Sequence, residues 1–262
     1  MCPSWTAGSR SGRGNRLSSS ISTPVREREP SSVKSSEIED IDFHAILFDL
    51  DGTLLDTLVD IADSMNAALA RLGFPTHPVD AYRYFVGDGS DTLVRRALPV
   101  GRADAKTVKK CHEASMAEYA RRWAEHTRPY PGIPELLHEL NRRRIMKAVL
   151  SNKRDDFTRL TVAKLLPGFS FDVVRGARPS TPVKPDPTAA LQIAEELHVP
   201  PEQFLYFGDT NTDMQTAVAA GMYPAGVLRG FRTADELTAS GAKVLLKSPH
   251  DVLDLLAPSR TD

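Results

Sequence analysis

The chain has 262 residues, a formal net charge of −1 at pH 7 and a sequence pI of about 6.7. This balanced charge gives no support for binding to nucleic acid or for a polybasic contact with a membrane. No apolar run approaches the roughly 18 residues that a membrane span requires, and the two cysteines do not suggest a disulfide framework. Length and composition therefore indicate one large or two small globular domains, expected in a reducing compartment.

Residues 1–42 differ in composition from everything that follows. The first 26 residues are rich in Ser and Arg and contain no Asp or Glu, whereas residues 27–42 are mixed and acidic. Because few of them are apolar, this segment cannot bury a core, and we expect a disordered N-terminal extension. A transit peptide, a plain disordered tail and translated sequence upstream of a misassigned start all stay open as interpretations.

The stretch around Asp49 and Asp51 carries the strongest chemical signal. The apolar run Ala45–Phe48 predicts a buried strand, and the two carboxylates follow at its end. Alternate residues of an extended chain point the same way, so both carboxylates can face one pocket. Two like charges this close require a bound cation or a proton held on one of them. The next turn contains a glycine, which allows a sharp bend, and Thr53, which adds a hydroxyl.

Helical patterns follow this turn. Apolar residues recur at three- and four-residue steps over 59–72 and again over 93–98, with a glycine-rich loop at 85–91 between them. A third helix is expected over about 104–125. We therefore predict that residues 57–127 form an all-helical insert. Such an insert, at the mouth of an α/β sheet, is well placed to act as a lid.

Strands and helices alternate from residue 128 onward. Strands are predicted at 147–150, 171–174, 204–207, 224–228 and 243–246. Helices are predicted at 133–144, up to about 166, at 188–198 and up to 221, with a final helical turn at 251–256. Together with the strand at 45–48, this alternation predicts an α/β fold with a doubly wound parallel sheet.

Polar residues stand where these strands end or in the loops beside them. They are Asp49 and Asp51, Ser151 and Asn152, Lys184, and Asp209 and Asp213. Open α/β sheets bind ligands outside the carboxyl ends of their strands, so we expect these side chains to share one site. The charge run Lys153–Asp156 is interpreted instead as the solvated start of a helix.

In this order the motifs resemble the signature of the haloacid dehalogenase superfamily, from about residue 43 to residue 258. Its four motifs are carried, in chain order, by Asp49-x-Asp51-x-Thr53, Ser151, Lys184, and Gly208-Asp209 with Asp213. The dehalogenases themselves lack an acid at the place of Asp51, so the chain resembles the phosphotransfer members. The resemblance implies a Rossmann-like core at 43–56 and 128–258, with residues 57–127 as its helical cap.

The acidic residues suit a phosphotransfer mechanism. A carboxylate can attack phosphorus and form an aspartyl-phosphate, and Asp49 is the candidate nucleophile. Mg²⁺ prefers carboxylate and phosphate oxygens, which suits Asp49 and Asp209. The resemblance adds the backbone carbonyl of Asp51 as a metal ligand, which leaves its side chain free to act as general acid and base. Asp213 either supports the metal indirectly, by interacting with the residues that bind it, or belongs simply to the first turn of the next helix.

The phosphoryl group is expected to meet a second set of residues. Lys184, held between prolines, supplies a fixed cation to the phosphoryl group and to Asp49. Ser151, Asn152 and Thr53 offer hydrogen bonds to the phosphoryl oxygens.

The substrate is expected to be a small phosphorylated molecule. Residues 86–98 are similar to the phosphoglycolate phosphatase subfamily, so hydrolysis of 2-phosphoglycolate to glycolate and phosphate is the leading hypothesis. Arg96 is either a donor to the substrate carboxylate or a surface arginine. A pyrophosphatase, a sugar- or nucleotide-phosphate phosphatase, a phosphoglucomutase-type transferase and a non-catalytic phosphate-binding protein stay open. We expect a cytoplasmic monomer or homodimer, or an organellar enzyme if residues 1–42 are a transit peptide.

Overall fold

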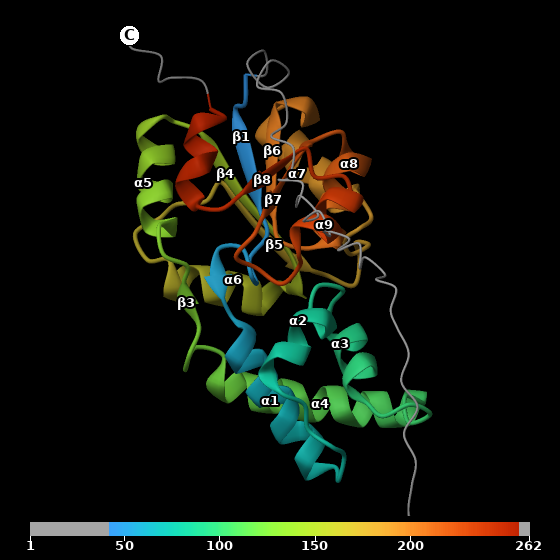
Figure 1. Ribbon diagram of the computed structural model, residues 1–262. Helices are drawn as coiled ribbons and strands as arrows, with labels where there is room; N and C mark the ends of the chain where they lie inside the picture. Colours follow the sequence, from blue (N-terminus) through green and yellow to red (C-terminus); the bar gives the residue numbers. More distant parts are fainter. Residues whose placement is uncertain (1–41, 257–262) are drawn as a thin grey trace, which may run out of the picture. The chain divides into compact units, whose positions relative to one another are not determined.

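The structure is a computed structural model, and it describes residues 42–256 of the chain (Figure 1). The expectations for the N-terminal segment therefore fall outside the described residues, apart from Asp42. Within the described range, six strands form one parallel sheet in the order β5–β4–β1–β6–β7–β8. This sheet confirms the doubly wound α/β fold that the alternation of strands and helices predicted.

Strand β1 lies inside this sheet, between β4 and β6. The six strands are β1 (Ala45–Phe48), β4 (Met146–Arg154), β5 (Val173–Ala177), β6 (Phe204–Gly208), β7 (Tyr223–Val227) and β8 (Val244–Leu246). All residues of β1 are fully buried. A strand covered on both faces reads as a continuous apolar run, which is why this one was located from the sequence. Its carboxyl end delivers Asp49.

Helices cover both faces of the sheet. They are α5 (Ile133–Arg142), α6 (Asp155–Leu165), α7 (Thr188–Leu197), α8 (Asn211–Ala220) and α9 (Ala234–Ala239), with short 3₁₀ helices η3 (Pro201–Gln203) and η4 (Pro249–Asp254). Side chains alternate between the two faces of a strand. Ile46 and Phe48 therefore pack in a cluster with α5, while Ala45 and Leu47 pack in a cluster with α7 and α8. Figure 1 shows α5 on one side of the sheet and α7 and α8 on the other.

Strands β4 and β5 depart from their predicted bounds. The prediction for β4 ended at Leu150, whereas the strand continues to Arg154 with a register shift against β5. β5 starts at Val173, two residues later than predicted, because Asp172 makes hydrogen bonds of its own with Lys147. The extension of β4 carries further polar residues to the edge of the sheet where β1 ends.

Residues 57–127, here called the insert, are helical and separate β2 from β3 in the chain. The insert contains α1 (Leu58–Arg71), η2 (Val79–Ala81), α2 (Tyr82–Phe85), α3 (Ser90–Ala97) and α4 (Ala105–Arg122). These helices bury an apolar cluster of their own, which includes Met65, Val94 and Cys111. Phe231, from the loop after β7, joins this cluster. Figure 1 shows the insert at the end of the sheet toward which β1 runs.

The two ends of the insert are fastened to each other. Strand β2 (Leu55–Asp56) pairs antiparallel with β3 (Arg128–Pro129). Beside them, the buried carboxylate of Asp60 in α1 accepts hydrogen bonds from the backbone N–H groups of His126 and Thr127, and from the Thr127 hydroxyl at 2.6 Å. Asp60 therefore joins the start of α1 to the segment that follows α4.

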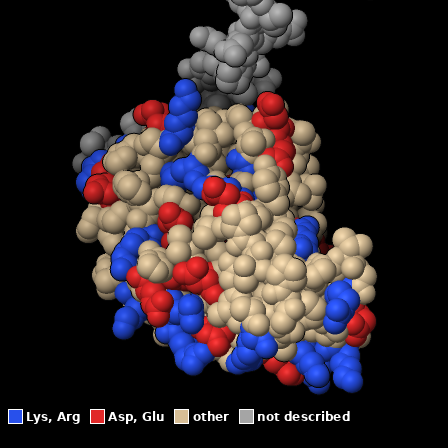
Figure 2. All heavy atoms as spheres, turned by 60° about the horizontal axis from the view of Figure 1, so that its bottom comes forward, with Lys and Arg blue, Asp and Glu red and all other residues tan. Residues whose placement is uncertain are grey.

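The surface near the insert carries charges of both signs. Figure 2 shows Lys and Arg side chains interspersed with Asp and Glu, next to a broad area without charged residues. On this face the basic side chains do not gather into the kind of patch that binds nucleic-acid phosphates. In the described part of the chain, no helix combines the length and the apolar character needed to cross a membrane.

Asp60→Ala is expected to lower the free energy of unfolding by about 1–3 kcal/mol, because it leaves the buried N–H and hydroxyl of Thr127 without their acceptor. Chemical denaturation followed by circular dichroism measures this change. Asp80→Ala removes a carboxylate whose side chain is 88 % exposed, and it serves as the matched control, with an expected change below about 0.5 kcal/mol. Equal effects of the two substitutions would contradict the fastening role of Asp60.

Candidate active site

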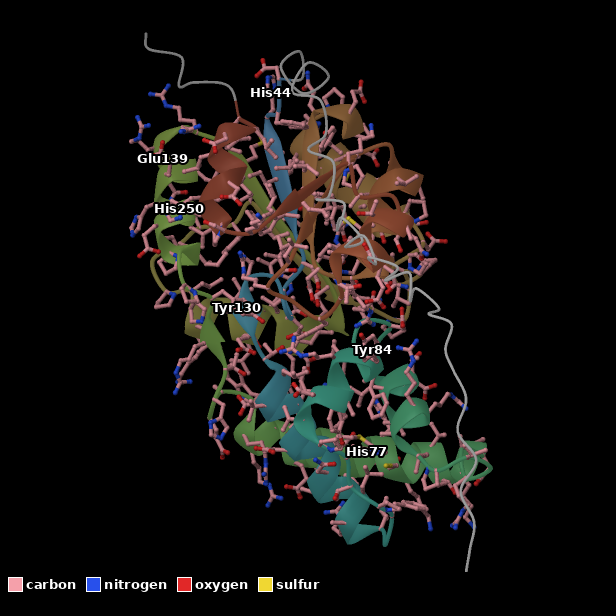
Figure 3. The ribbon with its side chains drawn as sticks, in the orientation of Figure 1. His44, His77, Tyr84, Tyr130, Glu139 and His250 are labelled. Atoms are coloured by element: carbon pink, nitrogen blue, oxygen red, sulfur yellow. The ribbon has the colours of Figure 1, made fainter. Side chains whose placement is uncertain are left out.

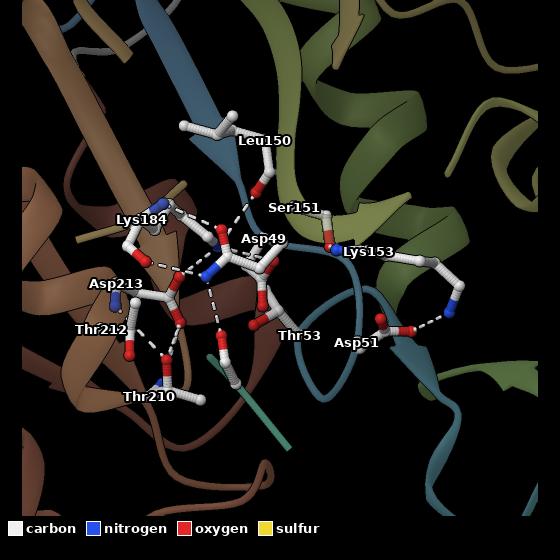
Figure 4. Close-up of polar contacts among 12 residues, drawn as sticks. Asp49, Asp51, Thr53, Leu150, Ser151, Lys153, Lys184, Thr210, Thr212 and Asp213 are labelled. Carbon is white, nitrogen blue, oxygen red and sulfur yellow. Dashed lines mark hydrogen bonds and ion pairs between the residues drawn. The ribbon is translucent and has the colours of Figure 1, made fainter. Parts of the chain in front are cut away.

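Lys184 holds two carboxylates together at the carboxyl end of the sheet (Figure 4). Its Nζ lies 2.8 Å from Asp49 Oδ1 and 2.6 Å from Asp213 Oδ1, and it donates to the Leu150 carbonyl at 3.1 Å. The Lys184 side chain is only 2 % exposed. Burial acts against its charge, but the carboxylates of Asp213 and Asp49 outweigh burial and raise the pKa of Lys184. The lysine is therefore a fixed cation beside the candidate nucleophile.

Asn152 fixes the loop that presents Lys184. The Lys184 N–H donates to Asn152 Oδ1 at 2.9 Å, and Asn152 Nδ2 donates to the Lys184 carbonyl at 2.9 Å. The same Nδ2 donates to the Gly87 carbonyl of the insert at 3.0 Å. The sequence suggested Asn152 as a donor to phosphoryl oxygens, whereas the structure directs its amide to backbone groups. Asn152 thus orients Lys184 and joins the insert to the core.

Asp209 follows β6 and is fully buried. Its Oδ1 accepts a hydrogen bond from the Thr53 hydroxyl at 2.6 Å, and its Oδ2 accepts one from the Phe231 N–H at 2.8 Å. Thr53, which the sequence suggested as a phosphoryl donor, is therefore directed to a carboxylate of the site. Gly52 and Gly230 approach so closely that a Cβ on either would lie 2.3 Å from Asp209 Oδ2. Larger residues at these positions would displace the carboxylate.

Asp213 serves both the helix and the site. Its Oδ2 accepts hydrogen bonds from the Thr210 N–H at 3.0 Å and from the Thr210 hydroxyl at 2.6 Å. The Asp213 N–H donates in turn to the Thr210 hydroxyl at 3.3 Å, which completes a capping box at the start of α8. Its Oδ1 binds Lys184. Asp213 therefore belongs to the first turn of α8 through one oxygen and binds Lys184 through the other, and its support of a metal stays a prediction.

One lysine faces three buried carboxylates in this cluster. Oxygens of Asp49, Asp209 and Asp213 lie within 4.8 Å of one another. Burial, reinforced by Asp213, raises the pKa of Asp49 to about 7 although Lys184 opposes the shift. Burial and the charges of Asp49 and Asp213 likewise raise the pKa of Asp209. Lys184 alone does not balance these charges, so a divalent cation that prefers carboxylate oxygens fits this cluster.

Asp51 is not part of this cluster and pairs with a second lysine (Figure 4). Its Oδ1 lies 2.7 Å from Lys153 Nζ, and the two side chains are 12 % and 8 % exposed. The interpretation of the charge run from Lys153 as a solvated helix start was wrong for this residue, because β4 continues to Arg154 and carries Lys153 inward. A signal was available in the sequence: Lys153 stands two positions after Ser151, so an extended chain points both the same way.

A cavity of about 110 Å³ opens beside Asp49 and Asp51. Ser151, which is buried, lines it from the core, and mostly apolar side chains line it from the insert. The Ser151 hydroxyl accepts a hydrogen bond from the Lys153 N–H at 3.3 Å, which leaves its own proton available for a ligand. The nucleophile, acid and serine suggested by the sequence therefore border the same space.

Arg96 lies elsewhere. Its guanidinium pairs with Asp88 at 2.6 Å and donates to the carbonyls of Tyr84 and Phe85. Asp88 also accepts a hydrogen bond from the Thr212 hydroxyl of α8 at 2.6 Å. The residues that line the cavity do not include Arg96. The structure thus places this arginine in a contact between the insert and the core.

The loop after β7 makes further contacts with the insert that the sequence did not indicate. Arg232 donates to the carbonyls of Arg83 and Val86, the latter at 3.1 Å, and Arg83 donates to the Gly230 carbonyl at 2.8 Å. The same loop supplies the N–H that binds Asp209. No local pattern could reveal these contacts, since Arg232 and Arg83 are 149 residues apart in the chain.

The doubly wound sheet and the acidic centre at its carboxyl end define the chain as an α/β enzyme with an aspartate-based site. Residues 46–227, more than half of the chain, match the family model described as haloacid dehalogenase-like hydrolase. The chain belongs to this hydrolase family, which confirms the resemblance drawn from its motifs.

Two relatives show the same similarity along most of their length. The chain is 32 % identical over 220 residues to a phosphoglycolate phosphatase of Pseudomonas putida, covering 83 % of this chain and 79 % of the relative. It is 30 % identical over 220 residues to a phosphoglycolate phosphatase of Nitrosospira multiformis, covering 82 % of this chain and 96 % of the relative.

Solved structures share the fold. A Lactobacillus delbrueckii subsp. bulgaricus protein, provisionally assigned as a phosphoglycolate phosphatase, superposes with a TM-score of 0.78 at 28 % identity, covering 83 % of this chain and 100 % of that one. A Bacteroides fragilis protein, provisionally assigned as a haloacid dehalogenase-like hydrolase, superposes with a TM-score of 0.75 at 26 % identity, covering 80 % and 100 % of the two chains.

The metal-free site is expected to destabilise the protein increasingly as the pH rises. The pKa of Asp49 is about 7 in the folded chain against an ordinary 3.8, so the folded state binds the extra proton between these values. The stability that this group contributes is full below pH 3.8 and is lost as the pH rises through about 7. A divalent cation that replaces the proton should therefore raise Tm more at pH 8 than at pH 5, measured by thermal unfolding with and without chelator.

Asp49→Asn is the matched control for this prediction. The amide removes the titrating charge but keeps an oxygen that can accept the hydrogen bond from Lys184. The metal-free variant should be more stable than the metal-free wild type at pH 8, and its response to the cation should be smaller. A gain in Tm that is the same at both pH values in the wild type would contradict the charge imbalance inferred for the cluster.

Proposed function

We propose that this chain is a metal-dependent phosphatase that hydrolyses a small phosphomonoester through an aspartyl-phosphate. One observation carries the proposal: Asp49 stands at the end of a central strand, 2.8 Å from a buried ammonium group, and borders a cavity. A carboxylate supplied with fixed positive charge can attack phosphorus and share the charge that develops in the transition state.

The reaction that we propose has two steps. An Asp49 oxygen bonds to phosphorus while the bond from phosphorus to the alcohol oxygen breaks, and Asp51 gives its proton to that oxygen. A water molecule then attacks the phosphorus, Asp51 takes the proton of the water, and phosphate leaves Asp49 free. Asp51 can act in both directions because it borders the same cavity as Asp49. Lys184 and the Ser151 hydroxyl stabilise the phosphoryl oxygens.

Asp49, Asp209 and Asp213 are the side chains that would hold the divalent cation, because their oxygens gather within 4.8 Å. We propose Mg²⁺ as this cation, since it prefers carboxylate and phosphate oxygens. When bound, it supplies positive charge to the phosphoryl group. The backbone carbonyl of Asp51 is the additional ligand that the family resemblance implies. In this proposal the insert acts as a cap that keeps water from the reaction.

We propose 2-phosphoglycolate as the substrate. Support comes from the relatives named phosphoglycolate phosphatase at 32 % and 30 % identity, and from residues 86–98, which resemble that subfamily. A pyrophosphatase, another phosphomonoesterase or a phosphoglucomutase-type transferase would use the same acidic centre, and only turnover separates them. A cytoplasmic location and a monomeric or homodimeric state stay predictions.

Release of phosphate from 2-phosphoglycolate is expected to depend on Mg²⁺ and to stop when the metal is chelated. The measurement is initial rates of phosphate release from 2-phosphoglycolate, pyrophosphate, glucose 1-phosphate and nucleoside monophosphates. A metal-dependent preference for one of the other compounds would exclude the substrate while preserving the mechanism. Transfer between sugar positions without release of phosphate would indicate a transferase instead.

Substitutions should rank the residues of the reaction. Asp49→Asn is expected to abolish turnover, because it removes the nucleophile. Asp51→Asn should lower kcat by about 10²–10⁴-fold, and Ser151→Ala by about 10²-fold. Steady-state kinetics measures these losses, with Asp235→Asn as the control, since that exposed carboxylate lies outside the cavity. Full activity of purified Asp49→Asn would eliminate the aspartyl-phosphate route.

A further inference from the structure

The cavity beside Asp49 continues into the insert, away from the carboxylate cluster. Its walls there are mainly apolar and include Ile61, Met65 and Leu93. Among the described residues that line the cavity, two are basic, Lys153 and Arg154. The Arg154 side chain is 51 % exposed and pairs with Asp156, whereas that of Lys153 is 8 % exposed. Lys153 is therefore the buried cation on the side of the cavity that would hold the leaving group.

Lys153 has hydrogen-bonding capacity beyond its ion pair. An ammonium group carries three N–H donors, and Asp51 Oδ1 accepts one of them at 2.7 Å. The ammonium also lies 5.0 Å from the centre of the Tyr119 ring, on α4 of the insert. Lys153 belongs to β4 of the core, so the two side chains meet across the boundary between core and insert.

Tyr119 presents a buried polar atom to the same space. Its ring lines the cavity, and its buried hydroxyl lies beside the Lys153 ammonium but makes no well-aligned hydrogen bond with the described residues. Burial raises the pKa of Tyr119, so the hydroxyl keeps its proton and can donate it. A buried hydroxyl without a partner is costly, and such a group at a cavity wall indicates a place for a ligand.

We propose that Lys153 Nζ and Tyr119 Oη together bind the carboxylate of the substrate's leaving group. This inference rests on the proposed function, in which the leaving group of 2-phosphoglycolate carries a carboxylate one methylene away from the bridging oxygen. Asp51, the residue assigned to protonate that oxygen, is already bonded to Lys153. Once Asp51 has given up its proton, its carboxylate and that of the leaving group repel each other, and the Lys153 ammonium offsets this repulsion.

This carboxylate site replaces the role that the sequence suggested for Arg96, whose guanidinium is paired with Asp88. This site would also discriminate between substrates with and without the carboxylate. A site built to hydrogen-bond a polar group rejects an analogue that lacks the group, because its own buried donors then stay unpaired. A phosphomonoester with an apolar group in place of the carboxylate would offer the Tyr119 hydroxyl no acceptor and Lys153 no second anion.

The test compares 2-phosphoglycolate with ethyl phosphate, which has a methyl group where the first has a carboxylate. The wild type is expected to prefer 2-phosphoglycolate in kcat/KM. Tyr119→Phe should lower kcat/KM for 2-phosphoglycolate by about 10- to 100-fold, and for ethyl phosphate by less than about 3-fold. Lys153→Met should lower both values, because it also frees Asp51, but the value for 2-phosphoglycolate should fall further, and Lys153→Arg should recover part of the difference.

Matched controls remove the same groups from the surface. Tyr84→Phe deletes the hydroxyl of a tyrosine that is 53 % exposed and lies at the border of the insert in Figure 3. Lys109→Met deletes an ammonium on α4 whose side chain is 79 % exposed. Neither should change the ratio of the two kcat/KM values by more than about 2-fold.

The outcomes separate this inference from the proposed function. Equal losses for both substrates in Tyr119→Phe would overturn the carboxylate site. A wild type that hydrolyses both substrates equally well would also overturn it, while the phosphatase function would stand. A wild type that releases phosphate from neither substrate, but from another compound of the panel, would overturn the proposed substrate and this inference with it.

Discussion

A single buried ammonium group, that of Lys184, is the interaction on which the candidate site depends. It bonds Asp49 and Asp213, which come from the ends of different elements, and without it both carboxylates would be buried close together with no counter-charge. Breaking a buried ion pair in this way is costly, since the remaining charges cannot reach water. The parallel sheet makes the contact achievable, because it brings the carboxyl ends of neighbouring strands to one edge. Asn152 then fixes the backbone from which Lys184 extends.

The cluster holds three carboxylates and one ammonium group, so a further positive charge is required to balance it. Asp209 is held by the Thr53 hydroxyl and the Phe231 N–H, and the missing side chains of Gly52 and Gly230 make room for its carboxylate. Its charge is therefore kept near Asp49 although burial opposes it. A protein that is rigid here cannot relieve the repulsion by moving side chains, so protonation or a bound cation must do so. The same hydrogen bonds would hold the carboxylate oxygens in place for the proposed metal.

The loop after β7 links the charged centre to the insert by hydrogen bonds. It donates an N–H to Asp209 on one side, and through Arg232 it binds backbone carbonyls of the insert on the other. The Gly87 carbonyl of the insert accepts from Asn152, which orients Lys184. Lys184 is thus linked to the insert through Asn152, and Asp209 is linked to it through the loop after β7. A displacement of the insert would therefore change the positions of both Asp209 and Lys184.

The sequence predicted the parts of this arrangement that depend on local patterns. The buried strand before Asp49 is a continuous apolar run, and the order of polar residues at successive strand ends followed from the alternation of elements. What each polar side chain bonds to did not follow. Thr53 and Asn152 could each donate to a phosphoryl group or to the protein, and that choice depends on residues far away in the chain. Likewise, the helical pattern around Arg96 did not reveal that its guanidinium pairs with Asp88.

Lys153 shows most clearly why side-chain partners require the three-dimensional structure. Its sequence neighbours are charged, which favours a solvated segment, yet β4 continues past Leu150 and carries it inside. The consequence is that Asp49 and Asp51, only two residues apart, each have a lysine of their own. Lys184 shares Asp49 with the carboxylate cluster, and Lys153 holds Asp51 beside the apolar part of the cavity. Neighbouring carboxylates in different surroundings can take different tasks in one reaction. In the proposed reaction, the two lysines, and not the spacing of the motif, would therefore separate the nucleophile from the acid.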